Sequence, residues 1–102
     1  MPVDRMTQQE AENILNGLID SLASIEHARW AHWQRYVHEH AKRQSDGSLV
    51  IPSELVDRWE RQIATAFEAL SDQEKESDRE QVRKYLPLIA SAFSAKLSGD
   101  HF

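Results

Sequence analysis

The segment from Glu26 to Tyr36 holds the residues of this sequence best suited to bind a ligand, because it interleaves aromatic and basic side chains. Aromatic rings stack on nucleotide bases, and guanidinium groups donate paired hydrogen bonds to phosphates. Together with one arginine from a later helix, the segment predicts a site for a small anionic, nucleotide-like ligand. The candidate site residues are Arg29, Trp33, Arg35, Tyr36 and Arg79.

The same aromatic residues have a second interpretation as packing anchors, because large rings dominate the cores of small proteins. Trp30 and Trp59 are predicted to lie mainly in the core, whereas Trp33 is open to either role. His27 is predicted to be buried or half-buried and bonded to a carboxylate. The sequence alone leaves both interpretations open.

Neither a catalytic group nor a metal centre is expected. The histidines at positions 27, 32, 38 and 40 share one predicted helix, but no two of them are four residues apart. The sequence has no H-E-x-x-H motif, no serine–histidine–acid set and no glycine-rich phosphate loop. We therefore expect a non-enzymatic protein with no metal and no other cofactor.

Composition narrows the class of protein further. The chain has 102 residues, which fits a single helical domain over 1–102 with flexible ends at 1–7 and 98–102. Seventeen acidic residues against 12 Lys and Arg give a net charge of −5, which argues against general nucleic-acid binding. There is no cysteine and no apolar run long enough to span a membrane, and residues 1–5 do not have the basic-then-apolar character expected of a signal peptide. These features predict a cytoplasmic protein.

The site residues depend on a long first helix. Thr7 and Glu10 form the S/T-x-x-E pattern of a capping box, and apolar residues then recur at helical spacing as far as Val37. The helix is predicted to run to about Lys42, with weak points at Gly17 and at residues 21–24. Residues 44–48 form a turn, and residues 49–51 are a brief extended segment for which no strand partner is expected.

Two further helices complete the expected fold. Pro52 or Ser53 opens the second helix, and a capping box of Ser71 and Glu74 opens the third. Pro87 is expected to kink or divide the third helix into residues 72–86 and 88–97. The fold class is therefore all-α, a small bundle of three to four helices with a long first helix and a Pro-kinked last helix.

The first helix is longer than any helix that could cover it, so part of its apolar face is predicted to pair with another copy of the chain. This first-helix stripe consists of Ile14, Leu15, Leu18, Ile19 and Leu22.

Four motifs resemble a group of small phage and prophage proteins: Glu26-His27-x-Arg29-Trp30-x-His32-Trp33, the segment from Asp46 to Pro52, Arg58-Trp59, and the segment from Leu70 to Glu80. Their order is also similar, more distantly, to the ryanodine-receptor repeat (RyR) domain. Two positions depart from that domain, since its Pro-Tyr is Ala66-Phe67 here and its aromatic-glycine turn is replaced by the Asp46-Gly47 loop. The motif positions are His27, Trp30, Trp59, Leu70, Glu74 and Asp78.

The resemblance implies a non-enzymatic phage or prophage protein in the bacterial host cytoplasm that binds or sequesters a nucleotide-derived defence signal. The alternative is a protein-interaction or structural phage module that acts through the first-helix stripe. A DNA-binding regulator fits less well, because the second helix carries Glu54, Asp57 and Glu60, which phosphates would repel.

Overall fold

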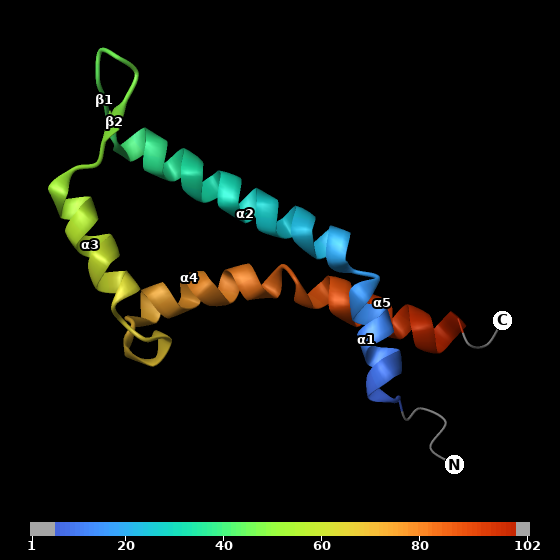
Figure 1. Cartoon of the computed structure of the whole chain (residues 1–102). Coiled ribbons are helices and arrows are strands. Elements are labelled where there is room, and N and C mark those ends of the chain that lie inside the picture. Colours follow the sequence, from blue (N-terminus) through green and yellow to red (C-terminus); the bar gives the residue numbers. More distant parts are fainter. Residues whose placement is uncertain (1–5, 100–102) are drawn as a thin grey trace. The chain divides into compact units, whose positions relative to one another are not determined.

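The computed structural model describes residues 6–99, and the side chains of residues 6–95. It is mainly helical, so the predicted all-α class is confirmed. In chain order (Figure 1) its elements are α1 (Gln8–Asn16), α2 (Ile19–His40), β1 (Lys42–Arg43), β2 (Leu49–Val50), α3 (Ser53–Ile63), the 3-10 helix η1 (Phe67–Ala69), α4 (Asp72–Arg83) and α5 (Leu86–Gly99).

The described residues divide into two compact units. The terminal unit comprises residues 6–27 and 80–99, and the central unit comprises residues 28–79. The single domain inferred from length remains a prediction. Of the flexible ends predicted at 1–7 and 98–102, residues 1–5 and 100–102 lie outside the described residues. Thr7 caps α1, and α5 continues to Gly99.

In the terminal unit, the predicted first helix is divided in two. Thr7 and Glu10 form the expected capping box at its start. The division falls at Gly17 and Leu18, the first of the predicted weak points, because glycine is a poor helix former. Helix α1, before the break, contacts α5. Beyond the break, the Glu26 carboxylate of α2 accepts a hydrogen bond from the Tyr85 hydroxyl.

The last predicted helix divides before Pro87, and not at it. Helix α4 ends at Arg83, residues 84 and 85 form a turn, and α5 begins at Leu86. The expected boundary at residues 86–88 is therefore wrong by a few residues. Proline clashes with the carbonyl group four residues earlier, which here belongs to Arg83, so the helix must end there. In the first turn of α5, the missing N–H of Pro87 costs no helical hydrogen bond.

In the central unit, a short hairpin follows α2. Lys42 pairs with Val50 and Arg43 with Leu49 in antiparallel register, so the expectation that residues 49–51 have no strand partner is wrong. The turn places Gly47 at φ 90°. The Asp46 carboxylate accepts hydrogen bonds from the Ser48 hydroxyl at 2.6 Å and from its backbone N–H at 2.9 Å, and these bonds lower the pKa of Asp46.

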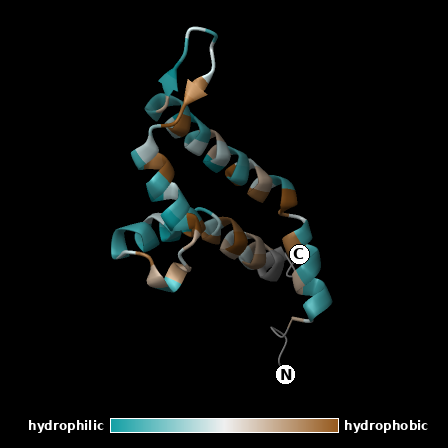
Figure 2. Ribbon diagram, turned by 60° about the vertical axis from the view of Figure 1, so that its left-hand side comes forward, coloured by the Kyte–Doolittle hydropathy of each residue, from teal (hydrophilic) through white to brown (hydrophobic). Residues whose placement is uncertain are grey.

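No side chain among the described residues is buried, so the apolar contacts leave every element partly open to solvent. Along α2, apolar residues alternate with hydrophilic ones (Figure 2). Trp59 is half-buried, but Trp30 is 59% exposed. The predicted core position of Trp30 is therefore wrong. No described helix is both long and apolar enough to cross a membrane.

We expect Gly47→Ala to destabilise the protein by about 1–2 kcal/mol, because a side chain at positive φ brings Cβ too close to the backbone. Gly47→Asn should cost less, since asparagine tolerates left-handed conformations. Urea unfolding followed by circular dichroism measures both changes. Equal stability of the Ala, Asn and wild-type proteins would show that the turn does not need glycine.

Candidate functional site

Tyr36 lies at the centre of an aromatic cluster that joins α2 to α3. Its hydroxyl accepts a hydrogen bond from the Arg58 guanidinium at 3.0 Å. The ring of Trp33 meets Tyr36 edge-on at 5.5 Å between centroids, and the ring of Trp59 is 6.4 Å away. Arg58 and Trp59 are neighbours on α3, so the two helices are held together by one polar and one aromatic contact to the same tyrosine.

His40 completes this cluster from the end of α2. Its ring stacks on Tyr36 at 3.9 Å with an interplanar angle of 25°, and its Nδ1 atom lies 2.8 Å from the Tyr36 carbonyl oxygen. Residues 33, 36 and 40 are three and four positions apart, the spacing at which side chains meet on one face of a helix. His40 and His38 are both exposed near the end of α2.

The structure brings together only some of the residues predicted to bind a ligand. Trp33 and Tyr36 are in contact, and Arg29 lies on the same face of α2. Arg35 follows Trp33 by two positions, about 200° around the helix axis, and therefore lies on another face. Arg79 belongs to a separate cluster at the start of α4. Arg58 was not among the predicted residues, because only the packing of α3 on α2 places it against Tyr36.

The separate cluster is built on Phe67 of η1. The Lys75 ammonium lies 5.9 Å from the centre of this ring and the Arg79 guanidinium 5.8 Å, both within range of a cation–π interaction. Arg79 also pairs with Glu76 at 3.5 Å. These contacts fix the beginning of α4 against the loop before it.

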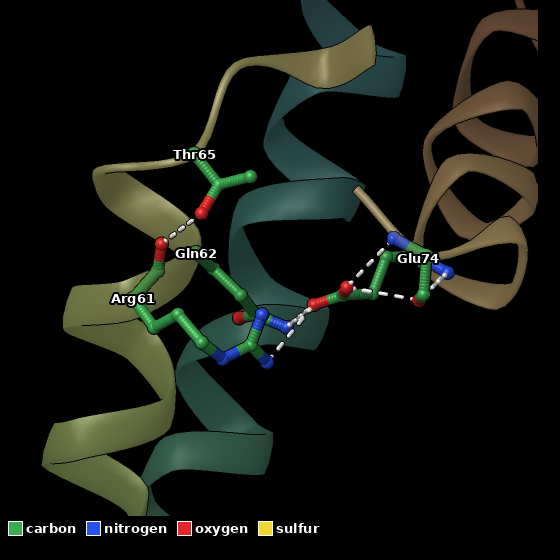
Figure 3. Close-up of polar contacts among 5 residues, drawn as sticks. Arg61, Gln62, Thr65 and Glu74 are labelled. Atoms are coloured by element: carbon green, nitrogen blue, oxygen red, sulfur yellow. Dashed lines mark hydrogen bonds and ion pairs between the residues drawn. The ribbon is translucent and has the colours of Figure 1, made fainter. Parts of the chain in front are cut away.

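Glu74 connects α3 to α4 through a network of hydrogen bonds (Figure 3). Its carboxylate accepts from the Gln62 amide at 2.5 Å, from the backbone N–H and hydroxyl of Ser71 at 3.1 and 2.9 Å, and pairs with Arg61 at 3.4 Å. In return, the Glu74 N–H donates to the Ser71 hydroxyl, which completes the predicted capping box. Hydrogen bonds from Gln62 and Ser71, with a smaller effect of Arg61, lower the pKa of Glu74 to about 2.

The other residues of the four sequence motifs lie apart from these clusters. Leu70 is half-buried between η1 and α4, and Asp78 is exposed on α4. His27 is also exposed, so its predicted burial is wrong.

The first-helix stripe does not form one continuous surface, because the break at Gly17 and Leu18 divides it between α1 and α2. Ile14, Leu18 and Leu22 are half-buried, whereas Leu15 and Ile19 are exposed. Only part of the predicted stripe is therefore available to a partner.

Within the described part of the chain, no three histidine or acidic side chains gather closely enough to hold a metal ion. The chain matched nothing among the protein-family models, the curated proteins and the solved structures with which it was compared. The site is therefore defined by geometry alone. Its clearest features are the aromatic cluster around Tyr36 and the exposed tryptophans of α2.

We expect Glu74→Gln to reduce the loss of stability at acidic pH. The pKa of Glu74 is lower in the folded protein than its ordinary value of 4.5, so its charge stabilises the fold above about pH 4.5. That contribution is lost as the pH falls toward 2. Urea unfolding between pH 5 and pH 2 should show a shallower decline in Glu74→Gln than in wild type.

The matched control for this experiment is Glu80→Gln, an exposed glutamate on the same helix. It should follow the wild-type pH dependence. If Glu74→Gln declined as steeply as wild type, the network around Glu74 would not be a source of stability.

Proposed function

We propose that this chain is a non-enzymatic protein-interaction module. One observation carries the proposal: no described side chain is buried, while ten large apolar side chains are 38–84% exposed. They are Leu15, Ile19, Trp30, Trp33, Val50, Ile51, Ile63, Phe67, Val82 and Leu86. Single exposed apolar residues are ordinary, but so many among described residues that form no buried core indicate surfaces that another molecule covers.

The residue types support the same function. Burying one large apolar side chain contributes about 1.5–3 kcal/mol, so covering several of them gives a strong driving force for association. Tryptophan and arginine, which are concentrated in the middle of α2, are also the residues most often found at the centres of protein interfaces.

The proposal extends to origin and location. The four motifs between Glu26 and Glu80 resemble those of phage and prophage proteins, and the chain contains no cysteine, which suits a reducing compartment. We place the protein in the cytoplasm of a bacterial host on these grounds.

Ile63 provides a direct test because it is 84% exposed at the end of α3. We expect the isolated, dilute protein to bind an apolar dye and to retain a specific protein from host extract. Ile63→Ser should weaken that retention, whereas the exposed neighbour Glu60→Ser should not. A dilute protein that binds no dye and retains nothing would contradict the proposed function.

A second candidate function is binding of a nucleotide-derived signal, favoured by the partly exposed ring of Trp33 beside Tyr36. The Arg58 guanidinium donates a hydrogen bond to the Tyr36 hydroxyl, and Arg29 lies on the same face of α2 as Trp33. Cationic groups therefore flank the ring of Trp33, which can stack on a base. Sequestration of such a ligand requires no catalytic residue.

A thermal-shift screen with cyclic oligonucleotides and ADP-ribose derivatives tests this candidate. A ligand at 100 times its Kd stabilises the fold by about 2.7 kcal/mol, which should raise the Tm by about 5 °C or more. Trp33→Ala should abolish the shift, while His32→Ala, on another face of α2, should preserve it. If no compound of the panel raises the Tm, this candidate is wrong and the protein-interaction function remains the proposal.

A further inference from the structure

Arg58 is an exposed cation of α3 with no acidic partner among the described residues. Its one side-chain contact there is the hydrogen bond of 3.0 Å from its guanidinium to the Tyr36 hydroxyl. A guanidinium has five N–H donors, and this contact uses a single one of them. The other donors of Arg58 are therefore available to a group from another molecule.

The Tyr36 hydroxyl adds a further donor beside this guanidinium. Its oxygen accepts the hydrogen bond from Arg58, so the hydroxyl can still donate its own proton. No described side chain accepts that proton. The phenol O–H and the remaining guanidinium N–H groups thus lie next to each other where α2 meets α3. An anion with two acceptor oxygens can accept hydrogen bonds from both residues.

The neighbouring rings hold these donors in place before any ligand binds. The ring of His40 stacks on Tyr36 at 3.9 Å, and the ring of Trp33 meets it edge-on at 5.5 Å. The Nδ1 atom of His40 lies 2.8 Å from the Tyr36 carbonyl oxygen, which only accepts, so this nitrogen carries a proton and the bond orients the imidazole. A side chain that is already held loses less conformational entropy on binding.

Trp33 supplies an apolar surface beside the donors. Its ring is 45% exposed and touches the ring of Tyr36. A ligand whose anionic group reaches Tyr36 and Arg58 can therefore place a neighbouring apolar group on Trp33. All of these residues belong to the central unit, so the arrangement is complete within that unit.

The charges of α3 favour a ligand group with a single negative charge. The helix carries three acidic residues against two arginines, and one of these, Arg61, already pairs with Glu74 at 3.4 Å. A phosphate monoester carries about 1.5–2 negative charges at neutral pH, and the acidic residues would repel it. A carboxylate carries one charge, which Arg58 alone balances, and its two oxygens match the fork of a guanidinium.

We propose that Arg58 and the Tyr36 hydroxyl form a carboxylate-binding site for a protein segment that presents a carboxylate next to a large apolar side chain. The carboxylate accepts hydrogen bonds from Arg58 and Tyr36, and the apolar side chain packs on Trp33. This inference rests on the proposed function and specifies the chemistry of the partner.

A matched pair of small probes tests the role of the charge. N-acetyl-phenylalanine combines a carboxylate with an aromatic ring, and N-acetyl-phenylalaninamide replaces that carboxylate by a neutral amide. The three tryptophans of the chain give three indole N–H signals in an NMR spectrum. The carboxylate probe, titrated at millimolar concentrations, should shift the signal of Trp33 to saturation. The amide should bind roughly tenfold more weakly, because hydrogen bonds to an ionised acceptor are about twice as strong as neutral ones.

Two arginine variants test the position of the site. Arg58→Gln should weaken binding of the carboxylate probe roughly tenfold or more, because it removes both the charge and the fork. Arg61→Gln is the matched control, since Arg61 lies about one turn further along α3 and pairs with Glu74. It should bind the probe as the wild type does.

Circular dichroism without the probe shows whether each variant keeps its helices. If Arg58→Gln does not, Arg58→Lys takes its place in the test. Lysine keeps the positive charge but cannot form the paired hydrogen bonds, so this variant should still bind the probe severalfold more weakly.

The absence of a saturable shift, equal binding of the amide, or wild-type binding by the Arg58 variant would each overturn the proposal. So would a loss in Arg61→Gln as large as the loss in Arg58→Gln. Tighter binding of phenyl phosphate that depends on Arg58 would overturn the choice of a carboxylate and favour the second candidate function. If Arg58→Gln retained a host protein as the wild type does and Ile63→Ser did not, this inference would be wrong and the proposed function would remain.

Discussion

Burial of apolar surface is the largest favourable contribution to the folding of most domains, and in this chain it is incomplete. The described side chains are at best half-buried, and the exposed ones include two of the three tryptophans. A domain of this size has only a small margin of stability. The structure therefore depends on the surfaces that cover its apolar residues, and this constraint underlies the proposed function.

Within each unit, a few polar contacts hold segments that are distant in sequence. In the terminal unit the Tyr85 hydroxyl bonds to Glu26. In the central unit the contact between Arg58 and Tyr36 joins α2 to α3, and the Glu74 network joins α3 to α4. Each such bond contributes only about 0.5–1.5 kcal/mol, or somewhat more when one partner is charged. These contacts define which residues meet, but they do not replace an apolar core.

The two candidate functions use the same stretch of α2 in different ways. A nucleotide needs the ring of Trp33 accessible beside an arginine, whereas a protein partner would cover that ring. Both uses depend on the ring of Trp33, which is 45% exposed.

The sequence alone determined the elements that depend on neighbours within about four residues. It predicted both capping boxes, the weak point at Gly17, the turn at Gly47 and the start of α3, because each is a local matter of hydrogen bonding or backbone freedom. The division before Pro87 was also predicted, although a few residues too late.

Only the tertiary structure decided which of these elements meet. It paired Lys42 and Arg43 with the short apolar strand, placed Arg58 on Tyr36, and left Trp30 exposed. A helical pattern shows that residues share a face, but it does not show whether another segment covers that face. Burial depends on segments far apart in the chain, so the sequence pattern alone could not separate a core tryptophan from a surface one.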